Sequence, residues 1–231
     1  MKTVVISGAS RGIGLALTEV FLQNGYKVVA TARDLKHATA LKELATKTDR
    51  EQLLLEPLDV QSSSSVLEFW GRLENLPSVE YLINNAGLLA EYGAGAGELN
   101  LDVVAQTFDV NTLGPMRMVQ AGLSHLQNSK RSCIVNVSSK VGSLTDNSSG
   151  FGYAYRMSKC ALNMFTQNLS IEFPKIVSVA FHPGWVQTDM GGKTAPTSPE
   201  ESASGMFTVI NGLKIKDSGR FLDFRGQALP W

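Results

Sequence analysis

The sequence predicts an α/β fold in a single domain over residues 1–231: a doubly wound parallel sheet of about seven strands with helices on both faces. Short, nearly continuous apolar runs alternate with longer helix-like segments, as in parallel sheets that are buried on both faces. A glycine-rich turn joins the first apolar run to the first helical segment. The length of 231 residues suits one large α/β core.

The predicted strands are short runs rich in Val, Ile, Leu and other apolar residues. These runs are 3–7, 27–31, 52–57, 79–84, 132–138, 176–182 and 219–224. In a doubly wound sheet, ligands bind at the carboxyl ends of the strands. Residues that directly follow the runs are therefore the first candidates for a functional site.

The segments between the runs carry helix signals. Serines in 62–65 are expected to cap one helix, and Ser198 another, with Glu201 closing a capping box. Long helices are expected over about 100–128 and 153–172. The apolar stripe of the second long helix is expected to be core, and it consists of Met157, Ala161, Met164 and Leu169.

The composition is that of a neutral globular protein, with 43% hydrophobic and 18% charged residues and 21 basic against 21 acidic side chains. This balance argues against binding nucleic acid or an acidic membrane. Cys133 and Cys160 are too few for a disulfide framework, so buried free thiols and a reducing compartment are expected. The apolar run in MKTVVISGAS is too short for a signal-peptide core or a membrane span, and we expect a soluble cytoplasmic protein.

The turn SGASRGIG, residues 7–14, has the character of a phosphate-binding loop. Its glycines allow a tight turn and a close approach of the backbone to a pyrophosphate, and the N–H groups and dipole of the next helix attract anions. A simple tight turn is the alternative, but a preceding strand and a following helix are the context that a dinucleotide site requires. The loop residues expected to bind the cofactor are Gly8, Ser10, Arg11, Gly12, Ile13 and Gly14.

The second strand indicates which dinucleotide is bound. NAD sites place an acidic residue at its end for the ribose 2′-hydroxyl, whereas this chain has Thr31 there, followed by Arg33. Arg33 and Arg11 could bind a 2′-phosphate, so NADPH is expected over NADH, unless Arg33 is only a solvated turn residue. Beyond the third strand, Asp59 and Val60 are expected to contact the adenine, although Asp59 could equally be a turn-capping residue.

The stretch YAYRMSKCALNMF, residues 153–165, places Tyr155 and Lys159 four residues apart at the start of a predicted helix. Positions i and i+4 share one helix face, so both side chains can point into one site. Tyr153 is off that face. A tyrosine at a helix start can also be an ordinary packing residue, so the spacing alone does not establish catalysis.

Seven motifs occur along the chain in the order of one family. They are SGASRGIG (7–14), LDV (58–60), NNAG (84–87), VNTLGP (110–115), IVNVSSKVG (134–142), YRMSK (155–159) and HPGWVQTD (182–189). In this ordered set the chain resembles the compact short-chain dehydrogenase/reductases, a Rossmann-like family, over nearly its whole length. The stretches YAYRMSKCALNM, HPGWVQTDMGG and SGRFLDFRGQALPW are similar to the C-factor and sniffer-like carbonyl reductase branch.

The resemblance implies a catalytic tetrad of Asn111, Ser139, Tyr155 and Lys159. Tyr155 would donate the proton, and Lys159 would lower its pKa and hold the nicotinamide ribose. Ser139 would donate to the substrate oxygen, and Asn111 would hold a water that links Lys159 to solvent. Taken singly, Ser139 could be a turn former and Asn111 a helix-kink or capping residue. Ser139 is preferred to Ser138 by alignment, since neighbouring strand-end residues point opposite ways.

The resemblance also implies further cofactor contacts. NNAG would flank the adenosine ribose through Asn85, Ala86 and Gly87. The PG loop would meet the nicotinamide through Pro183, Gly184, Val186 and Thr188. The chain departs from the family in Ser7, where threonine is usual, and in a long polar, glycine-rich insert between Ser139 and Tyr155.

The expected function is reduction of a small-molecule carbonyl by NADPH, in a homodimer or homotetramer, with no metal. The alternative is a C-factor-like nucleotide-binding signalling or regulatory protein with incidental reductase activity. A sugar epimerase or dehydratase of the extended branch would need a further substrate domain, for which the chain has no room. An apolar substrate pocket, or else ordinary packing, is expected at Leu88, Leu89, Tyr153, Trp185 and Met190.

Overall fold

The computed structural model describes residues 1–231 and contains one seven-stranded parallel sheet, in the order β3-β2-β1-β4-β5-β6-β7. All seven predicted strands are present, within two residues of their predicted bounds. They are β1 (Thr3–Ile6), β2 (Lys27–Ala32), β3 (Leu53–Pro57), β4 (Tyr81–Asn84), β5 (Cys133–Val137), β6 (Val177–His182) and β7 (Arg220–Asp223). The strand order reverses between β1 and β4, and a doubly wound sheet binds its ligand at such a switch point.

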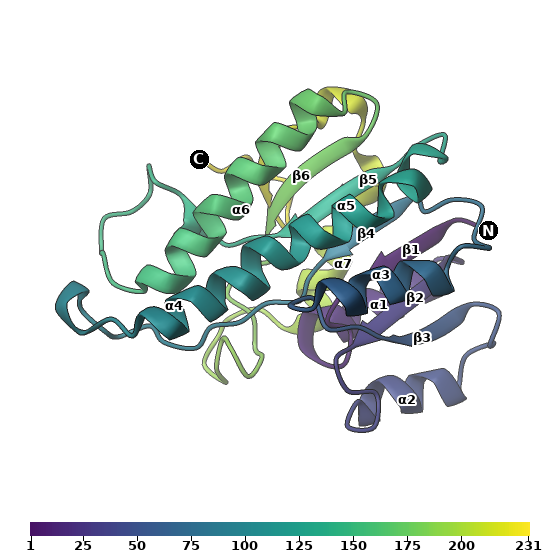
Figure 1. The fold of residues 1–231 in the computed structure, drawn as a ribbon, viewed down its shortest axis with the longest axis horizontal. Coiled ribbons are helices and arrows are strands. Elements are labelled where there is room, and N and C mark those ends of the chain that lie inside the picture. Colours follow the sequence, from purple (N-terminus) through teal and green to yellow (C-terminus); the bar gives the residue numbers. More distant parts are fainter.

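Helices cover both faces of the sheet (Figure 1). On one face lie α1 (Gly12–Gln23), α2 (Thr39–Thr46) and α7 (Pro199–Gly212). On the other lie α3 (Ser63–Arg72), α5 (Gly114–Gln127) and α6 (Tyr153–Glu172), with α4 (Leu101–Phe108) packed against α6. Successive strand residues serve opposite layers: Val4 and Ile6 pack on the first, and Val5 on the second. This explains the nearly continuous apolar runs.

Two helix starts follow the sequence signals. Ser62 caps α3 by accepting from the Ser65 amide, and Ser198 caps α7 by accepting from the Glu201 amide at 3.1 Å. The expected capping box at α7 is wrong. The Glu201 carboxylate lies 3.7 Å from the Arg225 guanidinium and forms no bond back to the Ser198 amide.

The long helix predicted over about 100–128 is interrupted. Between α4 and α5, Asp109–Leu113 form a π-helical turn, η2, in which the Gly114 amide donates to the Asp109 carbonyl. Asn111 lies in this turn and is fully buried. Single π-turns inside helices are frequent at functional sites because the extra residue re-aims the side chains.

The bounds of α6 match the prediction, but its predicted core stripe is largely wrong. Leu169 is buried, whereas Met157 is 41% and Met164 63% exposed. The buried face of α6 is mostly polar and includes Ser158, Lys159, Asn163 and Thr166. These side chains face β5 and η2 and form hydrogen bonds with residues there.

Three smaller findings complete the fold. Both cysteines are free, and Cys133 is buried, but Cys160 is only partly buried, contrary to the expectation of two buried thiols. No helix combines the length and the apolar character needed to cross a bilayer. No three His, Cys, Asp or Glu residues gather closely enough to hold a metal ion.

Candidate active site

The glycine loop is tied to the segment that follows β4. The Ser7 hydroxyl accepts from the Asn85 and Ala86 amides at 3.0 and 3.1 Å. The Asn85 side chain donates to the Ser7 and Gly8 carbonyls at 3.0 and 2.9 Å. Serine thus supplies the hydroxyl that threonine would supply, and the amide of Asn85 shapes the loop instead of pointing freely into the site.

Two positions must be glycine because neighbouring backbone atoms leave no room for a side chain. Gly8 has φ +68°, and a Cβ there would lie 2.8 Å from the Ala86 Cα. A Cβ on Gly14 would lie 2.2 Å from the Gly8 carbonyl oxygen. Helix α1 follows directly, and no side chain caps its first amides. Uncapped amides at a helix start behind a glycine turn can hold a dinucleotide pyrophosphate.

Two arginines lie near the end of β2, one in the turn that follows it and one in the glycine loop. Thr31 is buried, and Arg33 is exposed and forms no ion pair. Arg11 forms an ion pair with Asp189 at 2.9 Å, both side chains being mostly exposed. Two guanidiniums and no acidic residue at the Thr31 position fit the phosphorylated form of the dinucleotide.

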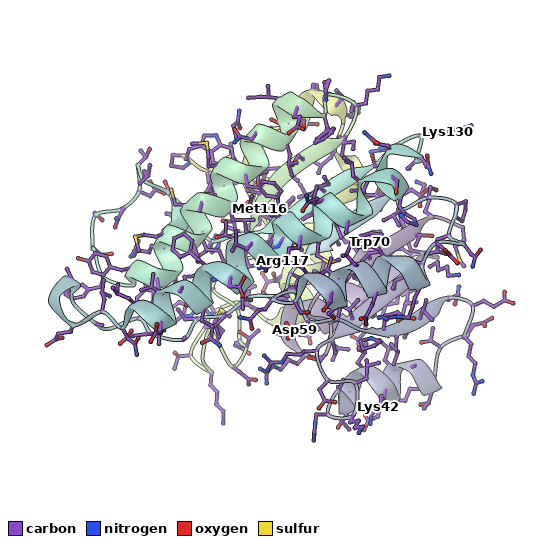
Figure 2. The ribbon with its side chains drawn as sticks, viewed as in Figure 1. Lys42, Asp59, Trp70, Met116, Arg117 and Lys130 are labelled. Atoms are coloured by element: carbon purple, nitrogen blue, oxygen red, sulfur yellow. The ribbon has the colours of Figure 1, made fainter.

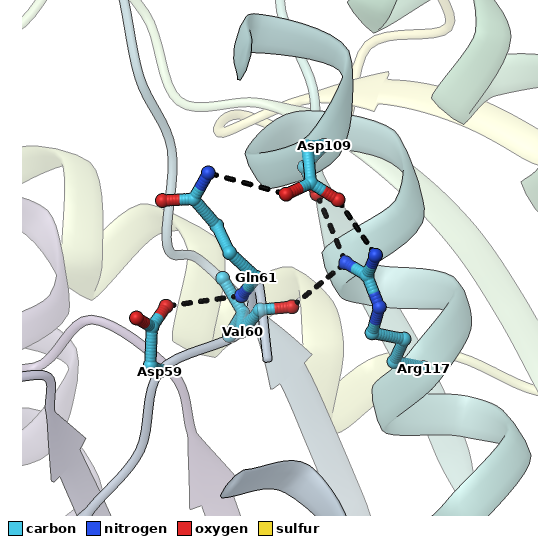
Figure 3. Close-up of polar contacts among 5 residues, drawn as sticks. All are labelled: Asp59, Val60, Gln61, Asp109 and Arg117. Atoms are coloured by element: carbon cyan, nitrogen blue, oxygen red, sulfur yellow. Dashed lines mark hydrogen bonds and ion pairs between the residues drawn. The ribbon is translucent and has the colours of Figure 1, made fainter. Parts of the chain in front are cut away.

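Asp59 adopts the turn-capping geometry that the sequence left open. One carboxylate oxygen accepts from the Gln61 amide at 3.0 Å, and the Asp59 amide donates to the Ser65 hydroxyl. The other carboxylate oxygen forms no hydrogen bond within the chain. The neighbouring carbonyl of Val60 accepts from the Arg117 guanidinium at 3.1 Å (Figure 3).

Tyr155 and Lys159 lie together on the inward face of α6. The Lys159 Nζ lies 5.5 Å from the centroid of the Tyr155 ring and donates to the Val137 carbonyl at 2.8 Å. Lys159 is 3% exposed, and Tyr155 is partly buried. The four-residue spacing therefore brings the phenol and the ammonium into one site at the end of β5.

Burial dominates the pKa values of this pair. It raises the pKa of Tyr155 to about 12, against a hydrogen bond with the Ser139 side chain that lowers it. It also lowers the pKa of Lys159 to about 8. The lowering of the Tyr155 pKa by Lys159 stays a prediction: burial sets the raised pKa here, with the Lys159 Nζ 5.5 Å from the ring centroid.

The two serines after β5 point different ways. Ser138 is buried, and its hydroxyl donates to the Asn163 side chain at 2.6 Å. Ser139 is partly exposed, and its side chain lowers the pKa of Tyr155. Of these two serines, only Ser139 therefore interacts with Tyr155.

Asn111 is anchored on both sides. Its oxygen accepts from the Leu88 amide at 2.7 Å, and its nitrogen donates to the Leu88 carbonyl at 2.8 Å and to the Ser158 hydroxyl at 3.0 Å. A Cβ on Gly87 would lie 3.5 Å from the Asn111 oxygen and 3.7 Å from the Lys159 Nζ. Both amide hydrogens of Asn111 are thus used, and a bridging water would need the remaining acceptor capacity of its oxygen.

The loop after β6 closes against the glycine loop. Pro183 accepts from the Ser202 hydroxyl at 2.6 Å, Gly184 has φ +91°, and Val186 forms a bridge with Thr197. A Cβ on Gly12 would lie 3.0 Å from the Thr188 Cγ2. The two loops therefore contact each other at the carboxyl edge of the sheet, through Gly12 and Thr188 and through the Arg11–Asp189 ion pair.

Comparison with known proteins agrees with this geometry. The family model described as short chain dehydrogenase matches residues 2–199. The chain is a short-chain dehydrogenase. It is therefore an NAD(P)-dependent oxidoreductase by family, with the predicted sheet and glycine loop.

Three similar proteins are informative. The C-signal protein of Myxococcus xanthus is 44% identical over 155 residues, which cover 66% of this chain and 93% of that protein. The carbonyl reductase Sniffer of D. melanogaster has a TM-score of 0.95 and 30% identity, with 100% of both chains covered. The NADPH-bound carbonyl reductase from chicken fatty liver has a TM-score of 0.93 and 33% identity, covering 100% of this chain and 99% of that one.

The insert before α6 of this dehydrogenase is held by residues that the sequence analysis missed. Arg156 donates to the Ser149 hydroxyl at 2.8 Å and to the Tyr92 hydroxyl at 3.3 Å. The Gly152 amide donates to the Tyr92 carbonyl at 3.0 Å. In the sequence, the signal for these contacts is Arg156 itself. A charged residue in the first turn of α6 lies next to the preceding loop and can bond to it.

The side chains expected to border a substrate differ in exposure. Leu88, Leu89 and Tyr153 are partly buried, whereas Trp185 is 56% and Met190 42% exposed. The indole nitrogen of Trp185 donates to the Gly191 carbonyl at 2.7 Å. The rim of the dehydrogenase site therefore carries accessible apolar surface that is held in place by the backbone.

Proposed function

We propose that this short-chain dehydrogenase is an NADPH-dependent carbonyl reductase acting on small molecules, with Tyr155 as the general acid. The observation that carries the proposal is the grouping of Tyr155 with Lys159 and Ser139, at the edge of the sheet where the glycine loop lies. NADPH in the chicken carbonyl reductase supports the choice of cofactor.

The chemistry follows from the protonation states of these side chains. The bound nucleotide would supply hydride to the carbonyl carbon, and negative charge would develop on the oxygen. With a pKa of about 12, Tyr155 is protonated at neutral pH and can donate to that oxygen while Ser139 orients it. The reaction leaves an alcohol and a phenolate.

Lys159 is suited to restoring the proton. With a pKa of about 8 it exchanges protons readily near neutral pH, and its charged form stabilises the phenolate that Tyr155 becomes. Gly87 opens the space between Lys159 and Asn111, where a water could connect the ammonium to solvent. We also assign Lys159 to the nicotinamide ribose hydroxyls.

The remaining cofactor contacts belong to the same proposal. Arg33 and Arg11 would bind the 2′-phosphate, and Asp59 would accept from the adenine amino group through its free oxygen. The sequence-predicted residues after β4 and β6 would flank the adenosine ribose and the nicotinamide. An exposed apolar rim, with Trp185 and Met190, favours bulky or varied carbonyl substrates.

The test compares Tyr155→Phe with Tyr153→Phe, which alters the same helix off the catalytic face. Loss of a general acid is expected to lower kcat by about 10² to 10⁴ with the NADPH Kd nearly unchanged. Tyr153→Phe should retain turnover within a few-fold. Equal kcat in wild type and Tyr155→Phe would refute the assignment.

A second candidate function rests on the 44% identity to the C-signal protein. In that case the chain would act as a nucleotide-binding signalling or regulatory protein, and reduction would be incidental. NADPH binding in the micromolar range without turnover on any carbonyl would favour this function. Efficient turnover would favour the reductase.

A further inference from the structure

Arg117 of α5 joins the loop after β3 to the π-turn. Its Nη1 donates to the Val60 carbonyl at 3.1 Å and to the Asp109 carbonyl at 3.4 Å, and its Nη2 donates to the Asp109 carboxylate at 2.6 Å. Figure 3 shows this guanidinium between the two segments, and Figure 2 locates Arg117 on α5 and Asp59 in the loop after β3.

The same carboxylate has a second contact with the β3 loop. Its other oxygen accepts from the Gln61 side chain at 3.2 Å, while the Gln61 amide donates to Asp59 at 3.0 Å. Asp109 and Arg117 are 28% and 22% exposed, so water screens their ion pair only in part. The loop 59–61 is thus bonded to the start of the π-turn in two ways. Arg117 bonds to both Val60 and Asp109, and the Gln61 side chain bonds to Asp109 directly.

Packing reinforces these bonds. The Asp109 carbonyl that accepts from Arg117 also accepts the Gly114 amide, the bond that defines the π-turn. A Cβ on Gly114 would lie 3.0 Å from the Val60 Cγ2. Any shift of the loop at Val60 therefore presses on the end of the turn, and Asn111 lies inside that turn.

We propose that Arg117 is a positioning residue that couples the loop 59–61 to the π-turn, so that an adenosine group bound at the loop fixes Asn111 in its place beside Lys159. This inference rests on the proposed function, which assigns the adenosine to Asp59 and Val60. It gives the adenosine half of the cofactor a role in ordering the tetrad, far from the reacting carbon.

The experiment measures amide hydrogen exchange in residues 109–113 of the full chain, with and without saturating adenosine 2′,5′-bisphosphate. In wild type, the fragment is expected to slow exchange there several-fold. Arg117→Met is expected to speed exchange about 10-fold without ligand, since hydrogen bonds to a charged group are lost, and to abolish the further response to the fragment. Arg117→Lys should restore part of the response, because an ammonium keeps the charge but not the fork of donors.

A matched control is Arg72→Met. Arg72 bonds to the Glu56 carboxylate at 2.6 Å and to the Pro57 carbonyl at 2.9 Å, close to the same loop, but does not touch the π-turn. It should leave exchange in 109–113 and its response to the fragment as in wild type. If Arg117→Met fails to fold, Asp109→Asn tests the same bond with a smaller change in shape.

The outcomes separate the two proposals. A fragment that binds wild type without changing exchange in 109–113, or a response that persists in Arg117→Met and Asp109→Asn, overturns the coupling and leaves the reductase proposal standing. A fragment that does not bind wild type even at millimolar concentration overturns the assigned adenosine site, and the coupling with it.

Discussion

Cofactor selectivity gives a prediction whose size can be worked out from two arginines. Arg33 is exposed and unpaired, so its guanidinium is free to bind a 2′-phosphate. Arg11 forms an ion pair with Asp189 at 2.9 Å, so to bind a 2′-phosphate it must weaken or break this pair. The two residues therefore differ in what they contribute to NADPH binding.

The expected magnitudes follow from exposure. A hydrogen bond to a charged group contributes about 1.5 to 3 kcal/mol, and an exposed site takes the lower value, so Arg33→Ala should raise the NADPH Kd about 10-fold. An exposed ion pair such as Arg11–Asp189 is worth about 0.2 to 1 kcal/mol. Asp189→Asn should therefore lower the NADPH Kd by up to about 5-fold.

The assay is fluorescence titration of wild type and each variant with NADPH and NADH. NADH binding should change less than about 2-fold, because it has no 2′-phosphate. Lys36→Ala removes another exposed positive charge close to Arg33, and it serves as the control for a general loss of positive charge. Equal loss of both nucleotides in Arg33→Ala, or no loss at all, would refute this reasoning.

Three further predictions concern single side chains. Ser139→Ala should lower kcat strongly with little loss of stability. Ser138→Ala leaves the Asn163 side-chain oxygen without its donor, so it should lower the free energy of unfolding in denaturant by about 1 to 3 kcal/mol and keep turnover. The reverse pattern would contradict the assignment of Ser139. Burial lowers the pKa of His182 from 6.5 to about 4, so between these pH values the unfolded chain binds more protons than the folded one. The free energy of unfolding should therefore fall by about 2 kcal/mol from pH 7 to pH 5. His182→Gln should reduce this difference in urea titrations at the two pH values, and an unchanged difference would assign it to other groups. Met164 and Ile171, seven residues apart on one face of α6, are 63% and 71% exposed, and we propose that this helix face pairs two copies of the chain. Light scattering should then show a dimer or tetramer that Met164→Glu reduces to monomer, and a monomeric wild type would exclude the interface.

The sheet and the glycine loop were predictable because local patterns determine them. A continuous apolar run such as 4–6 occurs only where both faces of a strand are buried, as in β1. The tight turn at Gly8 and Gly14 depends on the absence of side chains, which the sequence shows directly. The bounds of α6 were also predicted correctly.

Other features depend on tertiary contacts that a pattern does not contain. The π-turn at Asn111 forms where Leu88, Ser158 and Arg117 bond to it, and the sequence pattern does not contain these contacts. On α6, Met157 and Met164 face outward, whereas polar side chains such as Lys159 and Asn163 take part of the buried face. The raised pKa of Tyr155 follows from burial, which a one-dimensional spacing cannot measure.

In the proposed reaction, Tyr155 delivers a proton during NADPH-dependent carbonyl reduction. NADPH oxidation by the purified chain against a panel of aldehydes, diketones and quinones, with NADH and Tyr155→Phe in parallel, measures this step. We expect turnover that prefers NADPH and is lost in Tyr155→Phe although the variant still binds the nucleotide. Nucleotide binding without turnover on any carbonyl, or turnover that survives in Tyr155→Phe, would contradict it.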